Sequence, residues 1–403
     1  MRIANSCIFQ NTPRSLSLSK CGGFRGLNRK FVFLHAFVVL LISACGQHSK
    51  HTHDGVILGD TISLTYAEGF AIIESADFKT LIVYDPWQPK SMLAKYYLVK
   101  NDSLDIPLDG MKVKIPIENL AVTAVTQIEF LNLLNEIDKI TGICSPELIY
   151  NQELQHKYQV GKIENLGDAF NINLEKSLKL NPDIVMMSGF KQDDPYAKRV
   201  LQAGVSVVYN NEWMESSLLA RAEWIKFVAA FFDKTEEADS IFNEVAQAYE
   251  SVKSQALAVQ NKPKVLTGSN FRGTWYMPGG KSFMAQLYHD AGADYRYADD
   301  GFKGSLPLSV ESVLVDFSDA DIWLNCNFTT INELIQVDKK HALFQPVQTG
   351  NVYNFNKRML KSGANDYWES AVARPDLLLA DVIAVLHPNL LPDHELVYTA
   401  RLK

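Results

Sequence analysis

The sequence predicts an α/β protein with two Rossmann-like lobes, a central cleft, one long helix joining the lobes, and a β-rich N-terminal extension. A repeat indicates the lobes: residues 172–189 and 308–326 each place a Glu at the front of a short amphipathic helix, followed by an Asp and a buried apolar strand. A second pair, AGVSVVYN at 203–210 and TGNVYN at 349–354, follows in the same order. Residues 216–259 contain no Gly or Pro and carry apolar residues at helical spacing, which predicts helices with a break near Asp233 and the long one after it. A cleft between two related halves is a usual place for a small molecule.

The N-terminal segment has the layout of a secretory signal. Residues 1–30 contain no acidic residue, and their basic residues are Arg2, Arg14, Lys20, Arg25, Arg29 and Lys30. The apolar stretch from Phe31 to Ala44 is too short for a comfortable membrane span, and it ends in I-S-A-C, which resembles a bacterial lipoprotein signal box. We therefore expect residues 1–44 to be removed and Cys45 to become the lipidated first residue. An ordinary signal or an N-terminal membrane anchor is the alternative, and the true start codon stays open because the segment before Phe31 is long.

The following segments lead from the anchor to the lobes. Residues 45–56 are polar and are expected to form a tether, in which His48, His51 and His53 are solvated rather than metal ligands. Residues 57–118 alternate apolar and polar residues between Asp, Gly and Pro, which is typical of antiparallel strands and hairpins. The role of this extension stays open. The chain is expected to be a periplasm-facing lipoprotein of the bacterial cell envelope, with inner or outer membrane undecided.

Charge and cysteine usage narrow the possible functions. The chain carries a net charge of −7, and loss of the basic segment 1–44 makes the mature protein more negative. A nucleic-acid partner is therefore not expected, because it requires a basic face. Cys144 and Cys326 lie beside apolar runs in different halves, which predicts buried free thiols rather than a disulfide.

The rest of the chain divides into three parts. The N-terminal α/β lobe is expected over residues 119–215, the connecting helices over 216–260, and the C-terminal α/β lobe over 261–403. Within the connection, residues 235–259 form a helix of about 38 Å at 1.5 Å per residue, which can run along both lobes. Such a stiff connector predicts only modest closure of the lobes around a ligand.

Taken in this order, the pieces resemble the helical-backbone class of periplasmic substrate-binding proteins. The resemblance covers roughly residues 119–390 and rests most on GKIENLGDAFNINLEKSLKLNPDIVM, the long helix and PGGKSFMAQLYHDAGADY, whereas NPDIV alone is weak. It implies the solute-binding component of an ABC importer, which captures a ferric siderophore, haem or cobalamin and delivers it to a permease dimer. Which metal chelate is bound stays open. The resemblance implies no cofactor besides that ligand, and we expect a monomer.

The resemblance also implies a role for two acidic residues. In this family one Glu on the top of each lobe pairs with arginines of the permease, and by motif position these are Glu175 in NLEK and Glu311 in SVES. Independently of the resemblance, carboxylates near helix N-termini are favoured by the helix dipole and accept paired donors from Arg. The alternative is that each Glu only stabilises the first turn of its own helix.

Ligand contacts are expected from loops at the carboxyl ends of strands, where open α/β sheets bind ligands. A large chelate needs aromatic walls and a few well-placed polar groups. The candidates in lobe 1 are Thr126, Gln127, Tyr150 and Phe190, and those in lobe 2 are Arg272, Trp275, Tyr276, Tyr367, Trp368 and Arg374. The two arginines could pair with carboxylates or phosphate on the ligand, although single arginines on loops are often only solvated. For Tyr150 two roles stay open: contact with the ligand, or packing within its own loop.

Two other functions remain as alternatives. A free metal-ion binding protein needs three or four convergent His and carboxylate ligands, but the nine histidines are scattered, so no metal site is expected. A periplasmic hydrolase-type enzyme could use the same cleft, but the sequence contains no GxSxG, HExxH, P-loop or GxGxxG. We therefore expect a binding protein rather than an enzyme.

Overall fold

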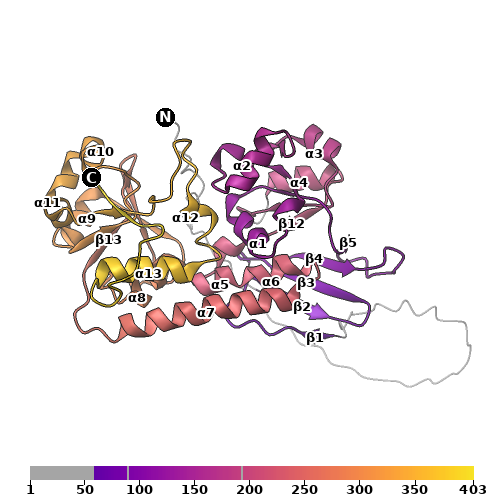
Figure 1. The fold of residues 1–403 in the computed structure, drawn as a ribbon, viewed down its shortest axis with the longest axis horizontal. Helices are drawn as coiled ribbons and strands as arrows, with labels where there is room; N and C mark the ends of the chain where they lie inside the picture. Colours follow the sequence, from indigo (N-terminus) through magenta and orange to yellow (C-terminus); the bar gives the residue numbers. More distant parts are fainter. Residues whose placement is uncertain (1–58, 89, 192–193) are drawn as a thin grey trace, which may run out of the picture. The chain divides into compact units, whose positions relative to one another are not determined.

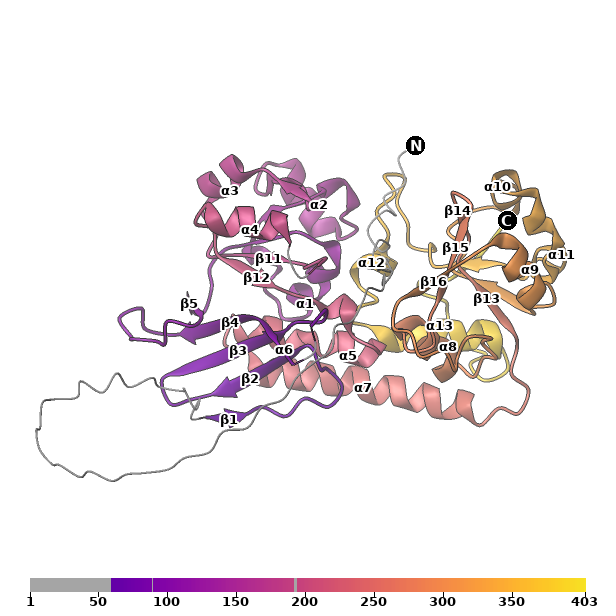
Figure 2. The same cartoon turned by 180° about the vertical axis from the view of Figure 1, so that it is seen from behind.

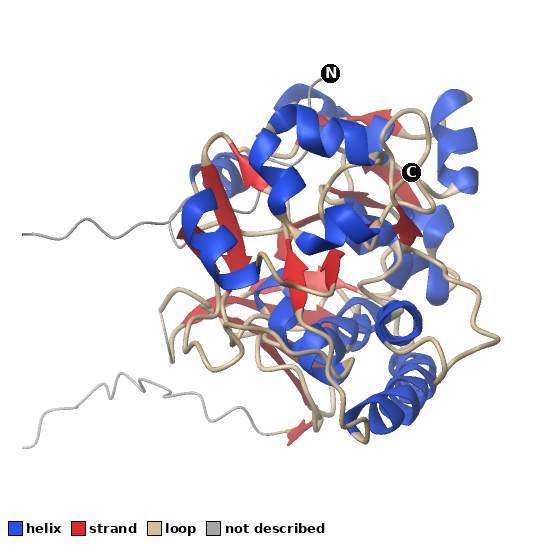
Figure 3. Ribbon diagram, turned by 90° about the vertical axis from the view of Figure 1, so that its left-hand side faces the viewer, coloured by secondary structure: helices blue, strands red, loops and turns tan. Residues whose placement is uncertain are grey.

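The computed structural model describes residues 59–88, 90–191 and 194–403. The predicted signal segment, Cys45 and the tether lie outside these residues. Two α/β lobes lie side by side along a long helix, and the extension packs below the first lobe (Figures 1 and 2). Most helices lie around the strands (Figure 3). The predicted fold class, two α/β lobes joined by one long helix, is confirmed.

Lobe 1 is built on a five-stranded, fully parallel sheet in the order β12-β11-β6-β7-β8. Its strands are β6 (Leu120–Val122), β7 (Ile140–Ile143), β8 (Glu164–Asn165), β11 (Ile184–Met187) and β12 (Val207–Tyr209), with a small hairpin of β9 (Gly167–Asp168) and β10 (Asn171–Ile172). Its helices are η1 (Val125–Gln127), α1 (Ile128–Leu133), η2 (Ile137–Lys139), η3 (Pro146–Leu148), α2 (Gln152–Gln159), α3 (Leu174–Leu180) and α4 (Pro195–Gln202). Every residue of β6 and β11 is buried, as expected for parallel strands covered on both faces.

Lobe 2 has a smaller parallel core. β13 (Val265–Thr267) pairs with β17 (Ile322–Leu324), and isolated bridges add Asp294 beside Lys264 and Val352 beside Trp323. The remaining strands are β14 (Asn270–Phe271), β15 (Thr274–Pro278) and β16 (Ser305–Leu308) in an antiparallel sheet, and the pair β18 (Tyr353–Asn354) and β19 (Ala400–Arg401). The helices are α8 (Phe283–Asp290), α9 (Val310–Phe317), α10 (Ile331–Val337), η5 (Lys339–Leu343), α11 (Gln345–Thr349), α12 (Asp366–Glu369) and α13 (Pro375–Leu386).

The repeated Asp has the same structural role in both lobes. In lobe 1, Asp183 Oδ2 accepts the N–H groups of Glu118 (2.7 Å) and Asn119 (3.0 Å), just before β6. In lobe 2, Asp321 Oδ2 accepts the N–H of Lys264 (2.8 Å), just before β13. Each Asp thus fixes the start of its own strand to the start of the neighbouring parallel strand. The sequence repeat therefore corresponds to a structural repeat.

The connecting helices span both hydrophobic cores. They are η4 (Glu212–Met214), α5 (Leu218–Ala222), α6 (Trp224–Ala230) and α7 (Thr235–Leu257). Ala238 and Phe242 of α7 belong to the core of lobe 1, whereas Tyr249 and Ala256 belong to the core of lobe 2. At 1.5 Å per residue this helix is about 35 Å long. The predicted helix is confirmed and ends at Leu257.

The extension is a five-stranded sheet in the order β1-β2-β3-β4-β5. Its strands are β1 (Asp60–Thr61), β2 (Phe70–Glu74), β3 (Phe78–Tyr84), β4 (Met92–Val99) and β5 (Met111–Lys114). One face packs on α6, where the Phe70 ring lies 4.8 Å from Trp224 and 5.5 Å from Phe227. The buried residues of this face belong to the same hydrophobic core as those of lobe 1. The extension is therefore part of the first lobe rather than a separate unit.

Two buried carboxylates anchor the loop that leads into β2. Glu223, with no exposed surface, accepts the backbone N–H groups of residues 65–67 at 2.8–2.9 Å. Glu215 accepts those of residues 68–69 at 2.9–3.2 Å and the indole N–H of Trp224 at 2.9 Å. Charge-assisted bonds to backbone donors are strong, so these two residues fix the extension to the connecting helices.

Candidate ligand-binding site

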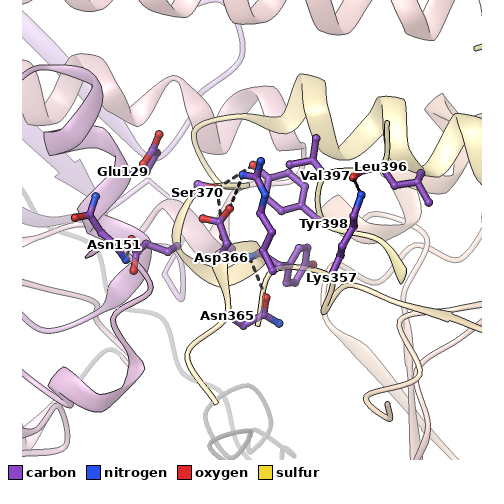
Figure 4. A network of polar contacts seen from close by, with 12 residues as sticks. Glu129, Asn151, Lys357, Asn365, Asp366, Ser370, Leu396, Val397 and Tyr398 are labelled. Carbon is purple, nitrogen blue, oxygen red and sulfur yellow. Dashed lines mark hydrogen bonds and ion pairs between the residues drawn. The ribbon is translucent and has the colours of Figure 1, made fainter. Parts of the chain in front are cut away.

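A cavity of about 320 Å³ lies between the two lobes. Lobe 1 contributes Glu129 of α1 and residues 150–152 at the start of α2. Lobe 2 contributes Arg358, Asp366, Glu369, Ser370, Arg374, Leu377 and Tyr398. Figure 4 shows Glu129 and Asn151 on one side, with Asp366, Ser370 and Tyr398 on the other. The volume lies at the lower end of the range for small-molecule pockets, about 300–1,000 Å³, and the lining is mainly polar.

Glu369 links the two lobes directly. Its Oε2 accepts the N–H of Tyr150 (2.7 Å) and its Oε1 accepts that of Asn151 (2.9 Å). The side chain is 2% exposed. Burial raises the pKa of this carboxyl to about 7, and the two backbone donors oppose the shift. A carboxyl of lobe 2 therefore holds the strand-end loop of lobe 1 at the edge of the cavity.

The arginines of the cavity are already paired. Arg358 Nη1 donates to Asp366 (3.0 Å), and Arg374 binds Asp376 with two N–H groups at 3.0 and 2.7 Å. Glu129 lies near these pairs, and burial raises its pKa to about 7. The cavity thus contains more carboxyl groups than guanidinium groups. It is suited to a ligand with polar or charged edges.

Asp381 positions the tyrosine of the cavity. This fully buried carboxylate accepts three consecutive backbone N–H groups, of residues 397–399, each at 2.7 Å, and His394 Nε2 lies 2.8 Å away. The C-terminal segment is thereby held on α13. Tyr398 then reaches the cavity, with its hydroxyl 2.9 Å from the Ser370 hydroxyl.

Several predicted site residues lie where the sequence placed them. Tyr150 and Arg374 line the cavity. Thr126 lies in η1 directly after β6, and Phe190 follows β11 at the same edge of the sheet. Contact of these residues with a ligand stays a prediction.

Trp275 was predicted as a cleft wall, and the structure corrects this. Residue 275 lies in β15, where burial alternates along the strand, and its side chain has no exposed surface. The ring stacks on Trp323 at 5.3 Å and packs against Phe344 at 5.6 Å, while its N–H donates to Thr267 O (2.8 Å). Trp275 is a core residue of lobe 2, because the segment expected to be a loop forms β14 and β15.

Gln127 and Tyr367 also need correction. Gln127 is fully buried, and its side-chain oxygen accepts the N–H groups of Thr123 (3.2 Å) and Ala124 (3.4 Å). It fixes the turn after β6. Tyr367 is 8% exposed, and its hydroxyl donates to Met284 Sδ at 3.7 Å within the core of lobe 2. Neither side chain presents an open surface to a ligand.

The other predicted residues of lobe 2 lie near the surface but not around the cavity. Arg272 is exposed in the turn between β14 and β15, and its guanidinium lies 5.2 Å from the Phe271 ring. Tyr276 is half-buried in β15. Trp368 is half-buried in α12 with its ring 4.8 Å from that of Tyr367. These three are not among the residues that line the described cavity.

Sequence reasoning missed the charged cavity residues Glu129, Arg358, Asp366 and Glu369, and also the neutral Tyr398. The stretch NDYWES contains two of these residues, but the aromatic residues within it were preferred as ligand contacts. Charged residues on short helices are usually solvated. Only the tertiary structure shows that Asp366 and Glu369 are buried at the junction of the lobes.

The two predicted docking residues are exposed. Glu175 lies in the first turn of α3 and Glu311 in the first turn of α9. Lys340 Nζ lies 2.5 Å from Glu311 and lowers the pKa of that carboxyl. α3 and α9 are the helices of the two repeat copies. Each lobe therefore carries an exposed Glu in the first turn of the corresponding helix. Contact with a permease stays a prediction.

The described part of the chain has two thiols and neither a cluster of metal ligands nor a membrane-spanning helix. Cys144 and Cys326 are buried free thiols, as predicted, and burial raises both pKa values to about 12. Residues 59–88, 90–191 and 194–403 contain no group of three His, Cys, Asp or Glu side chains that could hold a metal ion. The same residues include no helix both long and apolar enough for a transmembrane segment.

The structure is thus that of a two-lobed α/β protein with a cavity at the junction of its lobes. Residues 120–359 match the family model described as periplasmic binding protein. The chain therefore belongs to the periplasmic binding protein family. This family comprises extracytoplasmic solute-binding proteins, so the enzyme alternative is set aside.

Individual relatives agree with this membership. An uncharacterized lipoprotein of Methanocaldococcus jannaschii is 25% identical over 330 residues, 76% of each chain, and a second is 24% identical over 84% of this chain and 86% of its own. A periplasmic haem-binding protein from Pseudomonas aeruginosa has a TM-score of 0.54 at 17% identity, covering 71% of this chain and 98% of its own. An ABC transporter substrate-binding protein from Listeria monocytogenes has a TM-score of 0.52 at 19% identity, covering 68% and 100%. At these identities the structures show the fold alone.

Proposed function

We propose that this protein is the solute-binding component of an ABC importer and captures a metal chelate between its lobes for delivery to a permease. The observation that carries this proposal is the cavity between two repeated α/β lobes that are braced by α7. The solved structures with this fold include a haem-binding protein and a protein described as a possible iron-binding protein from Staphylococcus epidermidis. Two relatives are named lipoproteins, which supports the proposed lipid anchor at Cys45.

The cavity favours a ligand that has polar edges. Tyr150, Tyr398 and the carboxyl and guanidinium groups around them offer both donors and acceptors. Ferric siderophores, haem and cobalamin all carry polar groups around a metal centre. The proposal therefore keeps all three as candidate ligands and treats the metal as part of the cargo.

The proposed ligand class is tested with a thermal-shift panel on the full chain purified in detergent. The panel contains haemin, cyanocobalamin and ferrichrome. A ligand at 100 times its Kd stabilises the folded state by about 2.7 kcal/mol, so a binding chelate raises the melting temperature in a saturable way. Failure of all three to change the melting temperature would contradict chelate capture.

Docking to the permease is tested by charge reversal. Replacing both Glu175 and Glu311 with Lys should abolish uptake of the chelate in cells while its affinity for the purified protein stays unchanged. The control replaces Glu153 and Glu236, two exposed acidic residues at the starts of other helices, with Lys. Loss of ligand affinity in the first double variant would refute the docking assignment.

A further inference from the structure

The extension carries a tryptophan to the carboxyl end of the lobe 1 sheet. Trp87 lies in the turn after β3, where Asp85 Oδ1 accepts the N–H groups of Trp87 (2.8 Å) and Gln88 (3.0 Å). Gly189 follows β11, and a Cβ atom at that position would lie 3.3 Å from Trp87 Cη2. The edge of the Trp87 indole ring therefore packs against the backbone of lobe 1 just after β11.

Three further aromatic rings gather at this strand end. The Phe190 ring lies 4.4 Å from that of Phe170 and 6.2 Å from that of Trp213. Phe170, Phe190, Trp213 and Trp87 are all half-buried, and we call these four residues the aromatic shelf. Partly exposed rings from four chain segments therefore lie at the edge where open α/β sheets bind ligands.

Two buried donors at the shelf have no hydrogen-bond partner among the described residues. Asn211 is 3% exposed; its Oδ1 accepts the N–H of Gly189 (2.7 Å), which leaves its Nδ2 unbonded beside Gly189. Trp213 Nε1 is also buried and unbonded. An unsatisfied buried donor costs about 1–3 kcal/mol, so an acceptor that reaches either atom through a small side-chain shift would be bound favourably.

The residue next to Trp213 is linked to the opposite lobe through Arg221. Glu212, the residue before Trp213, accepts a hydrogen bond from Arg221 (2.7 Å). The guanidinium carbon of Arg221 lies 4.4 Å from the ring of Phe283 in lobe 2. The chain that carries the shelf is thus in contact with the opposite lobe.

We propose that the extension is part of the ligand site, and that the aromatic shelf binds the flat conjugated face of a chelate whose edge carries hydrogen-bond acceptors. This inference rests on the proposed function and narrows its ligand to a conjugated macrocycle. Aromatic rings stack on such a face, whereas an aliphatic chelate offers none. Asn211 and Trp213 supply the donors for the acceptor edge. Trp87 lies outside the residues that match the family model, so this chain brings its own element to the site.

Isothermal titration of the full chain with haemin, cyanocobalamin and ferrichrome tests the inference. A conjugated macrocycle, haemin or cyanocobalamin, should bind more tightly than ferrichrome. Trp87→Ala should weaken its binding about tenfold, the equivalent of about 1.4 kcal/mol. Trp213→Phe, which keeps a ring but loses the N–H, should weaken it by a smaller factor. Tyr84→Ala, which removes another exposed aromatic residue at the end of β3, is the control and should leave affinity unchanged.

The outcomes separate this inference from the proposed function. If no chelate of the panel binds, the proposed function fails and the inference fails with it. If ferrichrome binds best, or if Trp87→Ala matches Tyr84→Ala, chelate capture stands and the shelf is refuted. Trp87→Phe keeps the ring, so it should retain most of the affinity even if Trp87→Ala lowers the melting temperature.

Discussion

The two lobes use their aromatic residues differently. In lobe 2, Trp275, Trp323 and Phe344 have no exposed surface and pack with ring centroids 5.3–5.6 Å apart. In lobe 1, Phe190 follows β11 and stays half-buried, as does Trp213 of η4, whose ring lies 6.2 Å away. The antiparallel sheet of β14, β15 and β16 accounts for the difference, because it covers the aromatic residues of lobe 2. In our proposal lobe 1 offers the apolar surface for a ligand, and lobe 2 supplies most of the charged residues that line the cavity.

Truncating one tryptophan in each lobe tests this difference most strongly. Trp275→Ala should lower the free energy of unfolding by about 3–5 kcal/mol, because it empties a fully packed core position. Trp213→Ala should cost much less, because its ring is already partly in solvent. Urea unfolding of both variants measures the two losses. Equal losses would mean that the rings of the two lobes are equally buried in solution.

The carboxyl that links the lobes should make stability depend on pH. The pKa of Glu369 is raised from 4.5 to about 7, so its contribution is fully present below pH 4.5 and is lost as the pH rises through 7. This contribution is at most about 3 kcal/mol, at 1.36 kcal/mol per pKa unit. Glu369→Gln removes the titration, so the stability advantage of the wild type over this variant should shrink between pH 5 and pH 8.

The comparison needs a control, because Glu129 titrates in the same range. Glu129→Gln keeps Glu369 intact and should retain the part of the pH dependence that Glu369 supplies. Urea unfolding midpoints at pH 5 and pH 8 give the values. A wild-type advantage over Glu369→Gln that does not change with pH would show that this carboxyl is not buried between the lobes.

The attachment of the extension to lobe 1 gives the smallest expected effect. Glu223→Gln replaces a carboxylate that accepts three backbone N–H bonds and should lower the free energy of unfolding by about 2 kcal/mol. The extension and lobe 1 share one core, so a single unfolding transition is expected. Glu236→Gln, exposed on α7, is the matched control. Separate melting of the extension would contradict a shared core.

Sequence reasoning recovered the repeat and the long helix, because both are local patterns. Asp183 and Asp321 were recognised because each lies just before an apolar run, and their bonds to neighbouring strands explain why this order is repeated. Sequence reasoning did not show where the extension packs, since alternation marks an apolar face but not its partner. Trp275 was misassigned because the alternation in TWYMP was read as a loop. The burial of Glu369 depends on a contact more than 200 residues away.

In the proposed mechanism, solute is held at the junction of the two braced lobes. Hydrogen–deuterium exchange of the full chain, with and without the chelate that gives the largest thermal shift, measures whether a ligand protects both lobes. We predict slower exchange in residues 145–151 and 188–191 of lobe 1 and in residues 366–374 of lobe 2, with no change in α7. Slower exchange in one lobe only, or none at these three segments, would contradict the account.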